Sequence, residues 1–260
     1  MRADVYLSSN GLCESRSRAA VSIEGGCLFV NGVCVKKCSF DIKDGDTVEL
    51  RGDVIPYVGR GGLKLQGAID AFGLDAKGLV CVDIGASTGG FTDVLLKNGA
   101  ERVYAVDCGR GQLHHSLLND KRVVNIEGFN ARELKAETLG EKCDMAVMDV
   151  SFISQTLLHS AVRDTLKAGG AFVALIKPQF EVGRKSIGRG GIVKDAEAQM
   201  GAIAKTVESA SENGLSLMGI AVSPVRGGDG NKEFLAYFRL GGEPEVTLTR
   251  ELMRALVSGK

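Results

Sequence analysis

The stretch VCVDIGASTGGFTDVLL, residues 80–96, constrains the fold more than any other part of the chain. An apolar run typical of a buried strand leads into a glycine-rich turn, and a run typical of a helix follows. A turn of this kind commonly holds a nucleotide-like cofactor at the carboxyl end of a parallel strand. The segment therefore predicts an α/β fold and leaves open which cofactor it binds.

Two of three cofactor classes do not fit this turn. A P-loop needs GxxxxGK[ST], and the lysine that reaches the phosphates is missing after Gly85. A dinucleotide site needs GxGxxG, but Ser87 stands at the second glycine position. Asp107, after the next apolar run, can accept the hydroxyls of a ribose, and Asp83 can meet a cationic amino group. The pattern favours S-adenosylmethionine, and the alternative is a glycine turn with no ligand.

Strand-like and helix-like segments alternate from Val80 to Leu240. Repeated βα units imply a mainly parallel sheet with helices on both faces. The last two strands, joined by SPVRGGDGNK, predict an antiparallel hairpin at the sheet edge. We expect seven strands (80–84, 102–106, 123–126, 143–149, 171–177, 215–223 and 233–240) and five helices (63–72, 91–98, 112–119, 154–166 and 195–213).

The first part of the chain has a different pattern. A short helix in SRSRAAVSIEGG precedes strands separated by glycine turns, and Asn31-Gly32 between two apolar triplets is a strong hairpin signal. A connector with Gly and Pro, RGDVIPYVGRGG, follows. We therefore predict a small α+β domain over 1–56, a linker over 57–62, a main domain over 63–245 and a tail helix over 246–260.

Four charged residues are expected at one edge of the predicted sheet. Asp149 and Lys177 end apolar runs, Lys64 lies on the helix before the first strand, and Glu233 begins the last strand. Carboxyl ends of parallel strands face the ligand crevice, so these side chains should converge there. Each alone is more often a surface charge or an ion-pair partner. Together they indicate a catalytic set.

Several ordered motifs give the chain a family resemblance. DIGASTGGFTDVLL, AVDCGRGQL, MDVSFIS, IKPQFEVGR, GRGGIVKD and GNKEFL resemble the hemolysin A (TlyA) family of FtsJ-like ribosomal RNA 2′-O-methyltransferases, and SRSRAAVSIEGG with VNGVCV resembles its S4 RNA-binding domain. The resemblance implies a Rossmann-like class I methyltransferase fold preceded by an S4 domain. It implies a K-D-K-E tetrad at Lys64, Asp149, Lys177 and Glu233. The expected cofactor-binding residues are Asp83, Gly85, Ala86, Ser87, Thr88, Gly89, Gly90, Phe91, Asp107, Asn130, Ala131 and Asp149.

One segment departs from the family pattern. Family members often carry a Glu-Arg-Thr-Asn-like run after the third strand, whereas this chain has IEGFN at 126–130. We still expect Asn130 and Ala131 to approach the adenine of the cofactor.

The charge balance limits how the chain can bind RNA. The formal net charge is zero and the pI is about 6.8, which excludes a wholly basic binder but not a local basic patch. The loop RKSIGRGGIVK is basic, follows Lys177, and resembles a mobile lid that could track an RNA backbone. For the small domain, a solvated charged face is an equally good interpretation. The candidate RNA contacts are Arg16, Arg18, Lys36, Lys37, Arg60, Arg184, Lys185 and Arg189.

The remaining composition points to a cytoplasmic protein. There are seven cysteines and no CxxC, which favours free thiols in a reducing compartment, and zinc at Cys34-x-x-x-Cys38 would need two distant partners. We expect no metal. No signal peptide and no apolar run long enough to span a bilayer is apparent.

The resemblance leads to a mechanistic hypothesis. Lys177 would accept the proton of a ribose 2′-hydroxyl, Asp149 would orient Lys177, and Lys64 and Glu233 would place the ribose and its flanking phosphate. The partners would be ribosomal RNA and ribosomal subunits, with cytidines in the small- and large-subunit RNA as implied targets. The alternatives are a non-catalytic RNA-binding assembly factor, a membrane-active hemolysin and, against the Ser87 position, a dehydrogenase.

Overall fold

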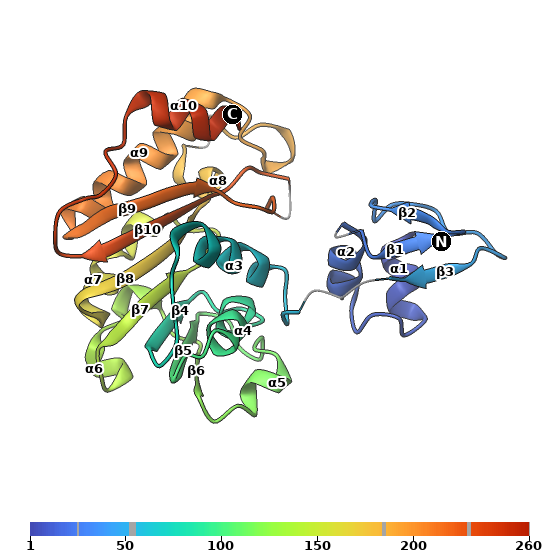
Figure 1. The fold of residues 1–260 in the computed structure, drawn as a ribbon, viewed down its shortest axis with the longest axis horizontal. Helices are drawn as coiled ribbons and strands as arrows, with labels where there is room; N and C mark the ends of the chain where they lie inside the picture. The colour runs from blue at the N-terminus through green and yellow to red at the C-terminus, as the bar shows by residue number, and fades with distance from the viewer. Residues whose placement is uncertain (25, 52–55, 184–185, 228–229, 260) are drawn as a thin grey trace. The chain divides into compact units, whose positions relative to one another are not determined.

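The structure is a computed structural model that describes residues 1–24, 26–51, 56–183, 186–227 and 230–259. The chain forms two compact units, Met1–Arg60 and Gly61–Lys260 (Figure 1). Each unit has its own core and is described by itself.

The first unit packs two helices against a small antiparallel sheet. Its strands lie in the order β2-β1-β3. The predicted Asn31-Gly32 hairpin is confirmed, since both residues have positive φ (51° and 78°), as a tight two-residue turn requires. Its elements are α1 (Ala3–Ser9), α2 (Arg16–Glu24), β1 (Leu28–Val30), β2 (Val33–Val35) and β3 (Val48–Leu50).

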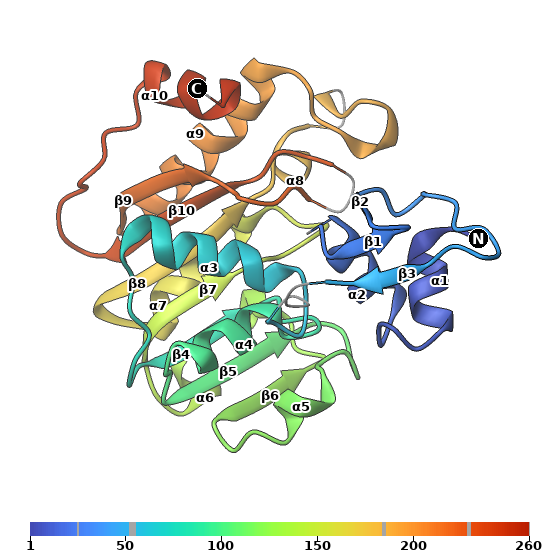
Figure 2. The ribbon, with the colours of Figure 1, turned by 45° about the vertical axis from the view of Figure 1, so that its right-hand side comes forward.

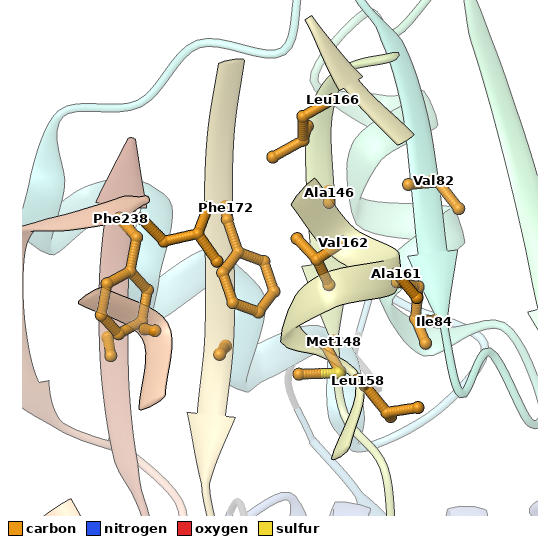
Figure 3. Close-up of a cluster of buried hydrophobic side chains, with 14 of the residues drawn as sticks. Val82, Ile84, Ala146, Met148, Leu158, Ala161, Val162, Leu166, Phe172 and Phe238 are labelled. Carbon is orange, nitrogen blue, oxygen red and sulfur yellow. The ribbon is translucent and has the colours of Figure 1, made fainter. Parts of the chain in front are cut away.

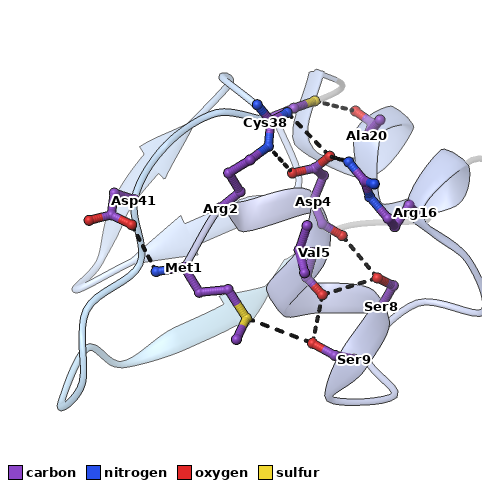
Figure 4. A network of polar contacts seen from close by, with 10 residues as sticks. All are labelled: Met1, Arg2, Asp4, Val5, Ser8, Ser9, Arg16, Ala20, Cys38 and Asp41. Atoms are coloured by element: carbon purple, nitrogen blue, oxygen red, sulfur yellow. Dashed lines mark hydrogen bonds and ion pairs between the residues drawn. The ribbon is translucent and has the colours of Figure 1, made fainter.

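Helix α1 was not expected from the sequence. Ala3 and Leu7, one helical turn apart, are fully buried in the core of this unit. Asp4 in its first turn accepts hydrogen bonds from Arg2 (2.9 Å) and Arg16 (2.7 Å), as Figure 4 shows. These guanidinium groups lower the pKa of Asp4 to about 2. Ala3, Val5, Tyr6 and Leu7 are the apolar residues of this helix, which is too short to carry a clear periodic signal, and one of the stabilising arginines comes from α2.

The second unit is built on a seven-stranded sheet in the order β6-β5-β4-β7-β8-β10-β9. All neighbouring strands pair in parallel except at β10, which is antiparallel to both β8 and β9. The predicted mostly parallel sheet and edge hairpin are confirmed. The strands are β4 (Val80–Ile84), β5 (Arg102–Asp107), β6 (Val123–Glu127), β7 (Cys143–Met148), β8 (Leu166–Ile176), β9 (Leu215–Val222) and β10 (Phe234–Leu240).

Helices cover both faces of this sheet, as predicted (Figures 1 and 2). Helices α3 and α4 pack on one face, against β9, β10, β4 and β5, and α7, α9 and α10 lie on the other. The α-helices are α3 (Gly61–Phe72), α4 (Gly90–Lys97), α5 (His115–Leu118), α6 (Ala136–Leu139), α7 (His159–Thr165), α8 (Pro178–Glu181), α9 (Ala196–Glu212) and α10 (Arg250–Ser258). Short 3₁₀ segments are η1 (Ala131–Glu133), η2 (Gln155–Leu157) and η4 (Arg189–Gly191).

Successive side chains of β4 point to opposite faces of the sheet. Val82 and Ile84 join the large apolar core with Phe172 of β8 and Val162 of α7 (Figure 3). The intervening Asp83 faces α4, where it is bonded to Thr92. Because side chains alternate along the strand, the Asp83 carboxylate lies on the face covered by α3 and α4, while Val82 and Ile84 lie in the core on the other face.

The tail helix predicted over 246–260 is helical only over α10, which begins at Arg250 after the N-cap Thr249. Two other helices are also shorter than predicted. The segment 112–119 is helical only over α5, because Glu127 accepts the backbone N–H groups of Gly111, Gln112 and Leu113. The segment 154–166 is divided into η2 and α7 and ends where β8 begins, at Leu166. At its start, the N–H of Gln155 donates to the carboxylate of Glu181 (2.8 Å). In both cases the backbone N–H groups near the start of the predicted helix donate to the carboxylate of a distant residue. In a longer helix, the N–H groups of the first turn would have no partner within the helix.

Candidate active site

The glycine turn joins β4 to α4 and lies against the segment that follows β7. Gly85 has φ 84°, and a Cβ on it would lie 3.1 Å from the carbonyl oxygen of Asp149 and 3.0 Å from Val150. Gly89, with φ 93°, caps the start of α4. Both positions require a left-handed backbone, and Gly85 also requires close approach, which explains glycine at each.

Asp83 is fully buried beneath the turn. Its Oδ2 accepts hydrogen bonds from the backbone N–H (2.9 Å) and the hydroxyl (2.7 Å) of Thr92. Its Oδ1 is also buried, and no hydrogen-bond partner for it exists among the described residues. Burial, together with the charges of Asp149 and Asp107, raises the pKa of Asp83 to about 7. An orphaned carboxylate oxygen of this kind suits a cationic ligand group.

Asp107 lies at the end of β5 on the other side of the turn. Its Oδ2 accepts the N–H of Ser87 (2.8 Å) and its Oδ1 the N–H of Gly109 (2.7 Å). Each oxygen keeps a lone pair, so the carboxylate can still accept ribose hydroxyls. The turn residues therefore fit the predicted S-adenosylmethionine: a ribose acceptor on one side and an unpaired buried carboxylate on the other.

The predicted adenine segment lies beside Asp107, because Phe129 N–H donates to the carbonyl of Asp107 (3.0 Å). Asn130 is exposed, and its amide caps η1 by accepting the N–H of Arg132. Ala131 is half-buried at the start of η1. Arg110, which sequence reasoning missed, packs its guanidinium over Gly128, within about 2.5 Å of where a Cβ would stand. Glycine at position 128 leaves room for that arginine.

The structure brings Lys64, Asp149, Lys177 and Glu233 together from four elements. Lys64 on α3 donates to Glu233, just before β10, at 2.7 Å, and lies 3.9 Å from Asp149. Asp149, just after β7, pairs with Lys177 at 2.6 Å. Lys177 follows β8 and is only 7% exposed. The result is one line of alternating charges, Glu233–Lys64–Asp149–Lys177.

Buried ion pairs of this kind are expensive to desolvate, and their mutual attraction offsets the cost only when the geometry is close. Here two cations and two anions balance. Glycine allows the surrounding backbone to approach, since a Cβ on Gly227 would lie 2.5 Å from an oxygen of Glu233. A fold that only needed stability would gain more from apolar residues, so the cluster is a strong candidate for chemistry.

Three residues near this cluster were missed by sequence reasoning. Lys177 also donates to the hydroxyl of Ser151 (2.8 Å). Phe152 has φ 64° and is 92% exposed, with its ring 5.2 Å from that of Phe180. Glu181 holds the same loop by accepting from Ser154 and from the N–H of Gln155. The signal available in the sequence was the aromatic in VSFIS directly after Asp149.

The predicted RNA contacts are spread over both units. Arg16 is engaged by Asp4, and Arg18 donates to the carbonyl of Tyr57 (2.8 Å), so both partly serve the fold of the first unit. Lys36 and Lys37 are exposed after β2, Arg60 ends that unit, and Arg189 is exposed on η4. Arg184 and Lys185 lie outside the described residues.

Two further properties can be stated for the part of the chain that the structure describes. It contains no cluster of three or more His, Cys, Asp or Glu side chains arranged to hold a metal. It also contains no helix with both the length and the apolar character needed to cross a bilayer.

The strand order, the glycine turn after the central strand and the acids at β4 and β5 define a methyltransferase of the Rossmann-like class. The chain belongs to the FtsJ-like methyltransferase family, whose model matches residues 57–240, and a model of the S4 domain matches residues 1–48. The predicted family and its S4 segment are therefore confirmed.

Relatives match most of the chain. Hemolysin A of Brachyspira hyodysenteriae is 43% identical over 92% of this chain and 99% of its own length. The 16S/23S rRNA (cytidine-2′-O)-methyltransferase TlyA of Mycobacterium tuberculosis is 39% identical over 92% of this chain and 89% of its own. A solved structure from Streptococcus thermophilus that carries a hemolysin name covers 100% of this chain and 94% of its own at 39% identity, with a TM-score of 0.78.

Proposed function

We propose that this protein transfers the methyl group of S-adenosylmethionine to the 2′-hydroxyl of a cytidine in ribosomal RNA. The observation that carries the proposal is the buried line Glu233–Lys64–Asp149–Lys177 beside the cofactor turn. The names of the Mycobacterium tuberculosis and Campylobacter jejuni relatives, both rRNA (cytidine-2′-O)-methyltransferases, support it. The reaction would take place in the cytoplasm, where ribosomal subunits are found.

The described residues around the turn supply a fitting set of contacts for the cofactor. Asp107 would accept the ribose hydroxyls, and the orphaned Oδ1 of Asp83 would accept from the cationic amino group, directly or through water. When bound, S-adenosylmethionine supplies a methyl group that its sulfonium already makes strongly electrophilic. The protein must therefore bring a nucleophile into line and take away its proton.

The tetrad can perform these two tasks. A ribose hydroxyl is a weak nucleophile at neutral pH, so a proton acceptor within hydrogen-bond reach increases the rate. We assign that role to Lys177, whose position is fixed by Asp149 and Ser151. Lys64, held by Glu233, would bind the ribose and the flanking phosphate through its ammonium group.

The exposed ring of Phe152 suits the other half of the nucleotide. Sequence-specific enzymes that act on RNA commonly stack an unpaired base on an aromatic side chain. Phe152 lies three residues after Asp149, and its ring is supported by Phe180, which also lies against Lys177 (5.8 Å). We propose that the target base stacks on Phe152.

The decisive experiment replaces Lys177 by alanine in the full chain. Labelled methyl transfer would be measured on ribosomal subunits from cells that lack the protein, and S-adenosylmethionine binding by calorimetry. Loss of the proton acceptor should reduce transfer by about 10²–10⁴-fold while the cofactor affinity stays within about twofold. Lys167→Ala is the matched control. Lys167, near the start of β8, pairs with Asp144, near the start of β7, at the ends of these strands that lie away from the tetrad.

Retained transfer by Lys177→Ala would refute the role given to Lys177. Mapping of 2′-O-methyl groups in both subunits would then identify the target. The Mycobacterium tuberculosis relative is named for both 16S and 23S RNA and the Campylobacter jejuni relative for 23S RNA alone. Absence of transfer to either subunit by the wild-type protein would contradict the proposed substrate.

A further inference from the structure

A groove of about 920 Å³ lies between the start of α9, the end of α10 and two loops of the second unit. The described residues of these loops are 192–194, which follow η4, and 226–227 and 230–232, which precede β10. Four cationic residues line the groove, and the described part of its lining contains no carboxylate. The four cationic residues are Lys194, Arg226, Lys232 and Arg254.

Lys232 is held close to another positive charge in the groove, although burial and that charge disfavour its ammonium form. Its ammonium donates to the carbonyls of Leu256 (3.1 Å) and Val257 (2.8 Å) at the carboxyl end of α10, which fixes it in the wall of the groove. Burial, and then the charge of Arg226, lower the pKa of Lys232. Like charges brought close together in a concave surface favour a bound anion.

The other cations are available to such an anion. Lys194 and Arg254 are exposed and have no ion-pair partner among the residues that the structure describes. Arg226 makes one hydrogen bond, to the carbonyl of Gly230 (3.2 Å). A phosphate group with several oxygens could therefore bind to more than one of these side chains.

The groove lies at the same edge of the sheet as the tetrad. Lys232 directly precedes Glu233 in the chain. The buried Asn231 ties the two loops together: its oxygen accepts the N–H of Val193 and its amide donates to the carbonyl of Gly191, both at 2.9 Å. The segment that leads into Glu233 is thus tied to the loop that carries Lys194.

We propose that this groove binds a backbone phosphate of the RNA outside the target nucleotide, and so fixes the direction in which the strand leaves the active site. The inference rests on the proposed function. It assigns a specific role to four residues, of which the sequence marked only Lys194, as part of a basic loop.

The test uses the full-length protein and purified ribosomal subunits from cells that lack it. Binding would be measured from 50 to 300 mM KCl for wild type, Arg254→Ala and the double variant Arg226→Ala/Arg254→Ala. For each phosphate that a variant no longer neutralises, the slope of log K against log salt should fall by about 0.7–0.9, and binding at 100 mM salt should weaken several-fold. S-adenosylmethionine affinity should stay at the wild-type value, which also shows that the variants fold.

Arg250→Ala is the matched control, because Arg250 lies one turn away on α10 and pairs with Glu197 (2.8 Å) outside the groove lining. It should keep the wild-type slope, and Arg254→Lys should keep most of it. Equal slopes for Arg254→Ala, Arg250→Ala and wild type would overturn the inference while methyl transfer by the wild type persists. Failure of the wild type to bind either subunit would instead overturn the proposed function and the groove with it.

Discussion

Replacing Asp83 by asparagine should make the second unit more stable at alkaline pH in the absence of cofactor. Asp83 is fully buried, and one of its oxygens is unpaired among the described residues. Burial is the main reason that its pKa is raised to about 7. Asparagine keeps an oxygen that can accept both hydrogen bonds from Thr92, and it removes the buried charge.

The expected size follows from the shift in pKa. In the unfolded chain the carboxyl loses its proton above its ordinary pKa of 3.8, whereas in the folded chain it keeps the proton until about pH 7. The unfolded state therefore binds fewer protons in this window, and the free energy of unfolding falls as pH rises through it. At about 1.36 kcal/mol per pKa unit, the wild type should lose about 2–3 kcal/mol between pH 5 and pH 8 through this group.

Urea unfolding followed by far-UV circular dichroism is the suitable assay, because the chain has no Trp. The stability of Asp83→Asn relative to wild type should increase by about 2–3 kcal/mol from pH 5 to pH 8. Asp70→Asn, at an exposed position of α3, serves as the control and should show no such trend. A difference between Asp83→Asn and wild type that is independent of pH would show that the buried carboxyl does not titrate as argued.

Two further substitutions test local geometry. Asp4→Ala should destabilise the first unit by about 1–2 kcal/mol at pH 7, because the Asp4 pKa of about 2 reflects hydrogen bonds from Arg2 and Arg16. The contribution of Asp4 to stability should disappear as pH falls from about 4 to 2. Amide hydrogen exchange of α1 would measure it. Gly227→Ala should reduce methyl transfer at least about tenfold with little change in cofactor affinity, because the alanine Cβ would lie 2.5 Å from an oxygen of Glu233. Transfer at the wild-type rate by this variant would contradict the role assigned to Glu233.

The sheet was predictable because its strands are long apolar runs. All five residues of β4 are buried and four of them are apolar, so the run is clear despite Asp83, and the glycine turn fixes where the strand ends. The same logic located Asp83 and Asp107 on either side of the turn. Such features depend on residues adjacent in sequence, which is why sequence alone was sufficient.

Features that depend on distant side chains were not predictable in this way. Glu127 shortens α5, and Glu181 shapes the loop that carries Ser151 and Phe152, each by accepting donors from another segment. The basic groove is assembled from two loops and two helices that lie far apart in the chain. Neither spacing nor periodicity in a single sequence contains that information.

The distribution of pairing within the site indicates where the fold has left room for ligands. The four tetrad side chains compensate one another in a line, whereas Asp83 remains a buried carboxylate with an oxygen that has no partner among the described residues. This unpaired oxygen thus lies on the cofactor side of the site, where a cationic methyl donor would favour the charged form of the carboxyl. In the groove, Lys194 and Arg254 have no ion-pair partner among the described residues, and a phosphate would neutralise them. The two substrates would therefore each relieve an electrostatic cost that the folded protein carries without them.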